Sequence, residues 1–347
     1  MKLFAFGLGY TARDFIARYG ASFEAVYATV RTSPKGSASA DRDLAEAQRP
    51  SLGAIDASGA AVLATTSPAP GVPPAMPAHP APPHPAPSTA VSGVNLKTFA
   101  FGRPEEDPLV EAALSDCDVL LISVPPGPSA DPVLAKYGRR IAALKRPLKI
   151  IYLSTVGVYG DRGGEWVDEE RLAMPKSGRS KVRLQAEKAW LALAKDPSKT
   201  VHILRLAGIY GPGRNALAAI KAGTARRIVK PGQVFNRIHV ADISAAIEAL
   251  VHYEGDGEIW NLSDDEPAPP QDVITYAAEL LGREPPPEQG LDEVELSPMA
   301  RSFYNENKRT SNEKIKRKLG VQLMFPTYRE GLAALFGAGE GRDAPAE

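Results

Sequence analysis

The sequence predicts an α/β protein built on a doubly wound parallel sheet, with a smaller C-terminal lobe and a disordered Pro/Ala-rich insertion. Three observations predict this class. Short, continuous apolar runs alternate with segments of helical periodicity, which is the pattern of strands buried on both faces and joined by helices. The pattern becomes less regular after Leu206, and a proline-rich segment interrupts it early in the chain.

The apolar runs predict six strands, at residues 2–6, 25–30, 96–100, 118–124, 149–154 and 201–206. Between the first two, apolar residues recur at helical spacing from Ala12 to Tyr19, and Gly20 is placed to end the helix, so the first unit is βαβ. Two further helices, at 242–253 and 270–281, and a strand at 258–262 are expected in a smaller lobe that is partly interleaved with the sheet.

A proline-rich stretch identifies the insertion. From residue 67 to 87 nearly every second residue is proline, and the rest are mostly Ala, Gly, Ser or His, so the segment lacks the apolar side chains that would offset the entropy of ordering it. We therefore expect a sheet domain at 1–34 and 95–206, a disordered insertion at 35–94, a C-terminal lobe at 207–336 and a disordered tail at 337–347.

Composition excludes several function classes. Lys+Arg and Asp+Glu both number 41 in 347 residues, so no net charge attracts nucleic acid or an anionic membrane surface. One cysteine and five scattered histidines cannot build a Cys/His metal site or an internal disulfide. No run approaches the roughly 20 apolar residues of a membrane span. We expect a soluble, cytoplasmic protein with no metal, no nucleic-acid partner and no membrane contact.

A glycine turn directly after the first strand predicts a dinucleotide site. Gly7 allows the tight turn, Gly9 removes the Cβ that would block a pyrophosphate, and Ala12 permits close helix packing. The first turn of the helix, with Tyr10 and Thr11, offers unpaired N–H groups and a partial positive charge to the diphosphate.

The end of the second strand bears on the choice of cofactor. An acidic residue there would bind a ribose 2′-hydroxyl, but residues 28–33 contain none. Arg31 can instead bind a 2′-phosphate through its planar fork, with Thr32 as an extra donor, so NADP(H) is favoured over NAD(H). The alternative is that Arg31 is a solvated surface residue.

Three further segments carry a resemblance to a known family: 152–160 (YLSTVGVYG), 204–214 (LRLAGIYGPGR) and 236–243 (NRIHVADI). With the glycine turn, they resemble the extended short-chain dehydrogenase/reductases, in particular the NAD(P)-dependent epimerase/dehydratase branch and its atypical YeeZ-like members. The resemblance covers nearly the whole chain outside the insertion. It implies a Rossmann domain that binds NAD(P) and a C-terminal lobe that closes over a small-molecule substrate.

The resemblance also implies a catalytic set. The family uses a Ser or Thr at the end of the fifth strand, then a Tyr and, four residues later, a Lys on the next helix, with the Tyr exchanging a proton with the substrate. Thr155 matches the first position. Counting back from the Ala-Glu pair that ends at Glu187, the Tyr position is Arg179 and the Lys position is Arg183. An arginine stays protonated and cannot transfer the proton, although Arg179 could polarise a carbonyl or bind an anion.

Two alternatives concern this helix. A shifted register places Lys181 in the Lys position and Ser177 in the Tyr position. In a purely structural interpretation, Arg183 and Glu187 form an ordinary surface ion pair at i,i+4 spacing. Tyr159 is then the nearest candidate acid, although in the family this tyrosine is usually structural or substrate-contacting.

Other positions are implied to contact ligands. Ser123 and Pro125, at the end of the fourth strand, fall where the family lines the nicotinamide ribose. Arg214 and Arg237 fall where the family faces the substrate, which suggests an anionic or sugar-nucleotide-like substrate. The structural alternative for Arg237 is an internal ion pair with Asp242 or a neighbouring carboxylate.

The favoured hypothesis is an NADP(H)-dependent oxidoreductase or epimerase acting on a carbonyl or alcohol, and the family suggests a homodimer. The rival is a non-catalytic NADP(H)-binding sensor or scaffold that has lost the Tyr-Lys pair. A third hypothesis, in which prolines 74–80 dock an SH3-like partner, ranks last because basic flanking residues are absent.

Overall fold

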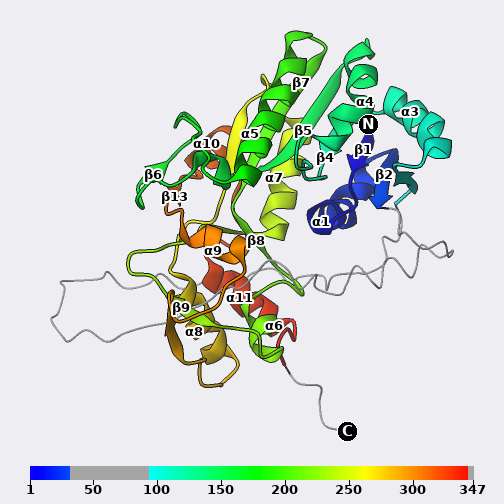
Figure 1. The fold of residues 1–347 in the computed structure, drawn as a ribbon. Coiled ribbons are helices and arrows are strands. Elements are labelled where there is room, and N and C mark those ends of the chain that lie inside the picture. The colour runs from blue at the N-terminus through cyan, green and yellow to red at the C-terminus, as the bar shows by residue number, and fades with distance from the viewer. Residues whose placement is uncertain (32–93, 343–347) are drawn as a thin grey trace, which may run out of the picture.

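The computed structural model describes residues 1–31 and 94–342 (Figure 1). In this part of the chain the centre is a seven-stranded parallel sheet in the order β11-β7-β5-β4-β1-β2-β3. Its strands are β1 (Lys2–Phe6), β2 (Ala25–Arg31), β3 (Leu96–Phe101), β4 (Val119–Ile122), β5 (Leu148–Thr155), β7 (Lys199–Leu206) and β11 (Ile259–Leu262). The predicted doubly wound parallel fold is confirmed, and the strand expected at 258–262 extends the sheet beyond β7.

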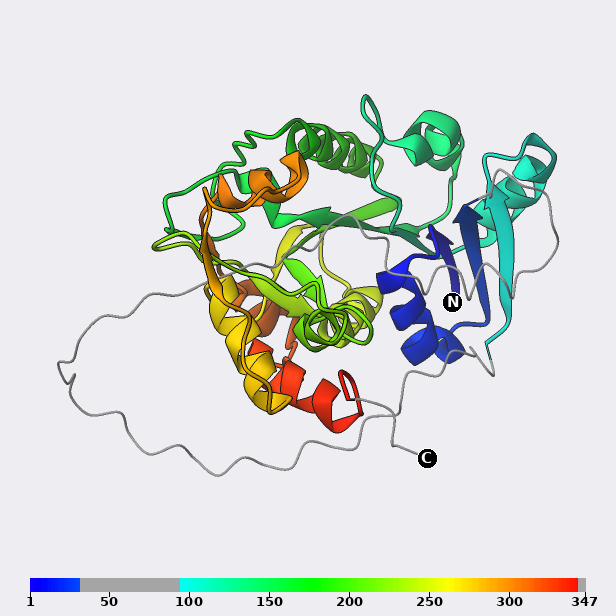
Figure 2. The ribbon, with the colours of Figure 1, turned by 60° about the horizontal axis from the view of Figure 1, so that its bottom comes forward.

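Helices cover both faces of the sheet (Figures 1 and 2). One face packs against α1 (Tyr10–Tyr19), α7 (Val240–His252) and α10 (Glu313–Leu319). The other packs against α3 (Asp107–Asp116), α4 (Pro132–Ala143) and α5 (Gly178–Leu191). Short 3-10 helices lie at Gly20–Ser22, Pro104–Glu106, Val156–Tyr159 and Ala192–Lys195.

Strand β1 shows how the sequence builds both cores at once. Leu3 and Ala5 point into the α1/α7 layer, whereas Phe4 and Phe6 point into the α3/α4 layer, and all four are fully buried. Each large apolar side chain buried in this way stabilises the fold by about 1.5–3 kcal/mol. The strand is therefore held firmly, and the turn that follows it at Gly7 has a fixed place at the carboxyl edge of the sheet.

The C-terminal lobe is assembled from short elements. They are β8 (Gly208–Tyr210), α6 (Ala216–Lys221), β9 (Arg227–Val229), β10 (Arg237–His239), α8 (Pro270–Leu280), β12 (Glu288–Gly290), α9 (Pro298–Tyr304) and α11 (Tyr328–Gly337). Strand β8 pairs with β10, and β9 pairs with β12. A further pair, β6 (Trp166–Val167) with β13 (Arg309–Thr310), joins the loop after β5 to the C-terminal part of the chain.

The C-terminal tail and the insertion are the two parts of the chain to compare with the expected organisation. The disordered tail was expected at 337–347, but Gly337 is the last residue of α11, and the Glu340 carboxylate accepts a hydrogen bond from the Gly213 N–H at 3.0 Å. All but the last residue of the 35–94 insertion lies outside the described residues, as do 343–347. Among the helices described, none is long and apolar enough to cross a membrane.

Candidate functional site

The turn after β1 requires glycine at its first position. Gly7 has φ +89°, a conformation that side-chain-bearing residues rarely adopt, and a Cβ there would lie 2.8 Å from Val124 Cγ2. Its N–H donates to Thr29 Oγ1 on β2 at 2.9 Å. The turn is therefore bonded to β2 and packed closely against the residues that follow β4.

The start of α1 fits a diphosphate. Gly9 is exposed and forms the N-cap, so no side chain caps the first N–H groups of the helix, and the only atom near a Cβ at this position would be Ser123 Oγ at 3.7 Å. Thr11 and Ala12 are buried beneath the turn. Only their backbone is then available to a ligand, whereas Ser123 faces the turn from the end of β4.

The second region predicted to contact the cofactor, at the end of β2, is described only in part. Arg31 is exposed and is the last residue of β2, at the same edge of the sheet as the glycine turn. Thr32 lies outside the described residues. Pro125 is exposed in the loop after β4, at the same edge of the sheet.

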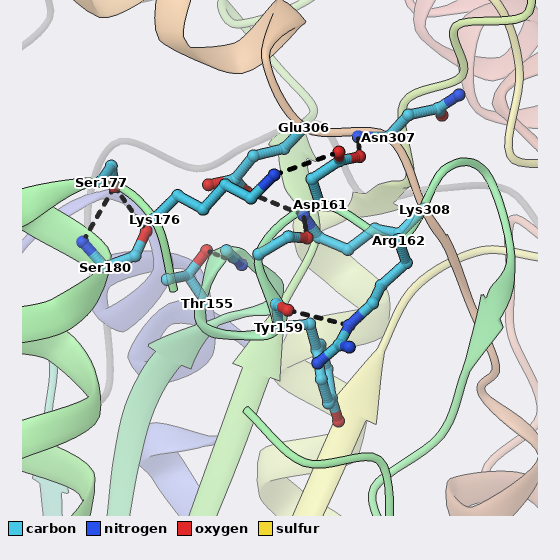
Figure 3. Close-up of polar contacts among 12 residues, drawn as sticks. Thr155, Tyr159, Asp161, Arg162, Lys176, Ser177, Ser180, Glu306, Asn307 and Lys308 are labelled. Atoms are coloured by element: carbon cyan, nitrogen blue, oxygen red, sulfur yellow. Dashed lines mark hydrogen bonds and ion pairs between the residues drawn. The ribbon is translucent and has the colours of Figure 1, made fainter. Parts of the chain in front are cut away.

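Hydroxyl groups gather at the end of β5 (Figure 3). Thr155 Oγ1 accepts the Gly157 N–H at 3.1 Å. A Cβ on Gly157 would meet Ser180 Oγ at 3.0 Å and Thr155 Oγ1 at 3.4 Å, so these two hydroxyls flank the same glycine. Ser177, the N-cap of α5, accepts the Ser180 N–H at 3.2 Å and donates its hydroxyl to Ser180 Oγ at 2.9 Å.

Sequence reasoning missed Ser180. Counting in steps of four from Glu187 selects Arg179 and Arg183, but successive helical residues point about 100° apart, and it is Ser180 that faces the end of β5. The Ser-x-x-Ser spacing at the start of α5 is typical of an N-cap and could have indicated which way this first turn faces.

The side chain of Tyr159 lies in the core and not beside the Thr155 hydroxyl. Its ring is fully buried, its hydroxyl donates to Asn261 Oδ1 at 2.7 Å, and Figure 3 shows the side chain directed away from Thr155. Burial raises the pKa of the phenol to about 12, against the partial opposing effect of Arg205, whose guanidinium lies 4.7 Å from the ring centre. Its position and its raised pKa both argue against Tyr159, the nearest candidate acid, as the proton donor.

The two arginines of α5 are separated by the structure. Arg183 donates to the Leu153 carbonyl at 2.9 Å and to the Tyr152 hydroxyl at 3.2 Å, which ties α5 to β5. Arg179 is exposed, and its guanidinium contacts Met299 Sδ on α9. Neither guanidinium has a described contact with Thr155.

The expected Arg183–Glu187 surface pair is wrong. Glu187 is buried and faces the sheet, where its carboxylate binds Arg205 of β7 at 2.8 Å and accepts the Ser154 hydroxyl. Burial acts to lower the pKa of Arg205, but the hydrogen bond and charge of Glu187 outweigh it and raise that pKa. A buried ion pair, stacked on Tyr159, therefore lies directly beneath the hydroxyl cluster.

The two arginines expected to face the substrate have different surroundings. Arg237 donates to the carbonyls of Phe235 and Ala268 at 3.0 and 3.1 Å inside the C-terminal lobe. It does not form an ion pair with Asp242, because the Asp242 carboxylate accepts hydrogen bonds from the backbone N–H groups of Met324 and Phe325. Arg214 is exposed and lies over the Tyr10 ring, 5.7 Å from its centre.

A second polar cluster fastens the loop after β5 to the C-terminal lobe (Figure 3). Lys308 is buried, and its ammonium group donates to the Gly160 carbonyl at 2.8 Å and pairs with Glu306 at 2.9 Å. Asp161 accepts the Asn307 N–H at 2.9 Å. Sequence reasoning did not identify this cluster. Among the residues that the structure describes, no group of three His, Cys, Asp or Glu side chains could hold a metal ion.

Comparison with known proteins finds relatives by sequence and similar solved structures. No family model matches the chain. Protein YeeZ of Escherichia coli K12 is 34% identical over 181 residues, which are 50% of this chain and 63% of YeeZ. A solved structure from Silicibacter pomeroyi, described as a functionally unknown conserved protein, is 37% identical, with a TM-score of 0.71, over 98% of this chain and 99% of that one. The chain is thus similar to YeeZ over half of its length and to the Silicibacter pomeroyi protein over nearly all of it.

Two other matches extend the comparison. The 3-diazoavenalumate denitrifying reductase of a Streptomyces species is 30% identical over 164 residues, which are 44% of this chain and 51% of that protein. The chain thus aligns with less than two thirds of the length of the curated relatives it matches. The dTDP-glucose 4,6-dehydratase of Bacillus anthracis, solved with NAD, shares the fold at 17% identity, with a TM-score of 0.64 over 96% of this chain and 94% of that one.

Proposed function

We propose that this YeeZ-like chain binds a nicotinamide dinucleotide at the Gly7–Tyr10 turn and acts as an oxidoreductase or epimerase on a small carbonyl or alcohol. The observation that carries the proposal is the turn itself, with a glycine in a left-handed conformation, an exposed Gly9 and the uncapped start of α1. A reductase among the relatives and a dehydratase solved with NAD among the structural neighbours support it.

When bound, the nicotinamide would donate or accept a hydride at the substrate carbon. The chain's own part is to hold the substrate oxygen. The hydroxyls of Thr155 and Ser180 converge beside Gly157 and can orient that oxygen. Arg179, one residue before Ser180, can stabilise negative charge on it if its guanidinium leaves Met299. Because Tyr159 is buried, we assign the proton to solvent or to the substrate.

The preference for NADP(H) over NAD(H) rests on Arg31. Its exposed position at the end of β2 places a guanidinium at the edge of the sheet that carries the glycine turn. NAD is the dinucleotide in the dehydratase structure, so the preference needs its own measurement. Replacing Arg31 by Gln should weaken binding of NADPH more than that of NADH. Equal losses would show that Arg31 does not read the 2′-phosphate.

A non-catalytic sensor or scaffold is the second candidate. It is favoured by the structural contacts of Tyr159 and Arg183, which direct the phenol to Asn261 and this guanidinium to Leu153 and not to Thr155. Such a protein would keep the dinucleotide site and lose turnover. The homodimer, the cytoplasmic location and the lack of nucleic-acid partners stay predictions.

One set of measurements tests the proposal. Purified chain is titrated with NADPH and NADH by fluorescence, and turnover is followed at 340 nm across a panel of ketones, aldehydes and anionic carbonyl compounds. Thr155→Val should lower turnover at least tenfold and leave the affinity for the dinucleotide unchanged. Thr200→Val, at the opposite end of the sheet on β7, is the matched control. Saturable binding without turnover in the wild type would favour the sensor, and no binding at all would overturn both candidates.

A further inference from the structure

We infer that Arg214 binds the diphosphate of the dinucleotide, and that the loop Gly211–Arg214 closes the cofactor site from the C-terminal lobe; this rests on the proposed function. The sequence had suggested a substrate contact for Arg214. The structure instead places its guanidinium beside the residue that begins α1, at the glycine turn.

The loop lies against the start of α1. The Tyr10 hydroxyl donates to the Pro212 carbonyl at 3.0 Å, and a Cβ on Gly211 would lie 2.6 Å from that hydroxyl, so no larger residue fits there. Figure 2 shows the C-terminal lobe beside α1 on this side of the molecule. Tyr10 therefore connects the first turn of α1 to a loop about 200 residues away in the chain.

The charge of Arg214 suits a phosphate group. It stacks over the Tyr10 ring at 5.7 Å, and within the described part of the chain no carboxylate forms an ion pair with it. Although the residue as a whole is exposed, desolvation of its guanidinium by the surrounding protein atoms lowers the pKa, and the neighbouring Tyr10 opposes this shift only in part. A cation in this position would add a forked donor to the N–H groups and partial positive charge that α1 already offers.

The loop is held in shape before any ligand arrives. Gly211 and Arg214 exchange two backbone hydrogen bonds at 3.0 Å, and Asn215 donates its side-chain amide to the Gly211 carbonyl at 2.9 Å. Gly213, at φ +69°, donates its N–H to the Glu340 carboxylate at 3.0 Å. Because the C-terminal segment fixes the loop, little ordering entropy is lost when Arg214 engages a phosphate.

The test measures binding and not turnover. NADPH, ADP and adenosine are titrated against the wild type, Arg214→Gln and Arg139→Gln; Arg139 is an exposed arginine on α4, on the other side of the sheet. Arg214→Gln should raise the Kd of NADPH and of ADP about 10- to 100-fold and leave that of adenosine unchanged. It should also reduce the dependence of the Kd on salt, because one cation no longer meets the diphosphate. Arg139→Gln should change none of these values.

A second variant tests the role of the anchor. Glu340→Gln removes the negative charge that accepts the Gly213 N–H and should raise the Kd of NADPH about threefold. In the double variant with Arg214→Gln, the Kd should rise no further than in Arg214→Gln alone. Unchanged Kd values for NADPH and ADP in Arg214→Gln would overturn the inference. If the variant changed only the KM of the substrate, Arg214 would be a substrate contact and not a diphosphate contact. If the wild type binds neither NADPH nor ADP, the proposed function itself fails.

Discussion

The substitution Glu187→Gln tests the network beneath the candidate site. Glu187 reaches from α5 to Arg205 on β7 and to Ser154 on β5, and Arg205 stacks on Tyr159. Glutamine keeps the size of the side chain and removes its charge. The change therefore asks whether a buried carboxylate holds these strands together one residue below Thr155.

The expected loss of stability follows from burial. The Glu187 and Arg205 side chains are only 1% and 4% exposed, so removing one charge leaves the other buried without its counter-charge. Breaking a buried pair in this way costs about 3–5 kcal/mol. At roughly 2–4 °C per kcal/mol for a large domain, Tm should fall by about 6–20 °C.

Thermal and urea unfolding of Glu187→Gln, Arg205→Met and Arg183→Gln checks this loss of stability. Arg183→Gln is the matched control, since its lost hydrogen bonds to β5 should cost only about 1 kcal/mol. A double-mutant cycle of Glu187→Gln with Arg205→Met should show strong coupling, and the cycle with Arg183→Gln should show little. A loss below 1 kcal/mol for Glu187→Gln, or coupling to Arg183 in place of Arg205, would refute the reasoning.

Two further predictions concern the glycine turn and a buried acid. Gly7→Ala should lower Tm and abolish NADPH binding, because the added Cβ clashes with Val124 and the left-handed φ is strained. Gly9→Ala should abolish NADPH binding at a nearly unchanged Tm, because no protein atom crowds a Cβ there. Equal losses of Tm in the two variants would contradict the separate roles assigned to these glycines. Burial raises the pKa of the Asp264 carboxyl to about 8, although Arg237 opposes the shift. The folded chain then holds a proton that the unfolded chain releases near pH 4, so stability should fall as pH rises from about 4 to 8. Asp264→Asn should remove this slope and be more stable than wild type at pH 9 in urea unfolding, and parallel pH profiles would disprove it.

The main sheet could be predicted from the sequence because its strands are buried on both faces. Continuous apolar runs predicted the bounds of five strands to within two residues at either end: β1, β2, β3, β5 and β7. The run at 118–124 was too long, since β4 ends at Ile122 and the Ser123 N–H bonds back to Phe6. The pairs in the C-terminal lobe were not predictable, because strands such as Trp166–Val167 and Arg309–Thr310 are two residues long and far apart in the chain.

The partner of Glu187 shows why the site was harder to predict than the fold. A spacing of i,i+4 predicts a pair with Arg183 on a solvated helix face, but it does not say which face is solvated. The better signal was Arg205, a charged residue inside the apolar run of β7, which requires a buried acid nearby. Contacts made by side chains across elements, such as Tyr10 with Pro212, have no local signature at all.

Two couplings determine how the site can work. The buried Glu187–Arg205 pair fixes the end of β5 from below, so Thr155 is positioned by the stability of the core. The Tyr10–Pro212 contact joins the cofactor turn to the C-terminal lobe, so binding of a dinucleotide and the position of that lobe should depend on each other. An enzyme would use this dependence to enclose a substrate above Thr155 and Ser180, and a sensor would use it to signal the cofactor's presence. The two functions share every feature of the cofactor side and differ only in whether those two hydroxyls meet a substrate, so substitution at Thr155 distinguishes them.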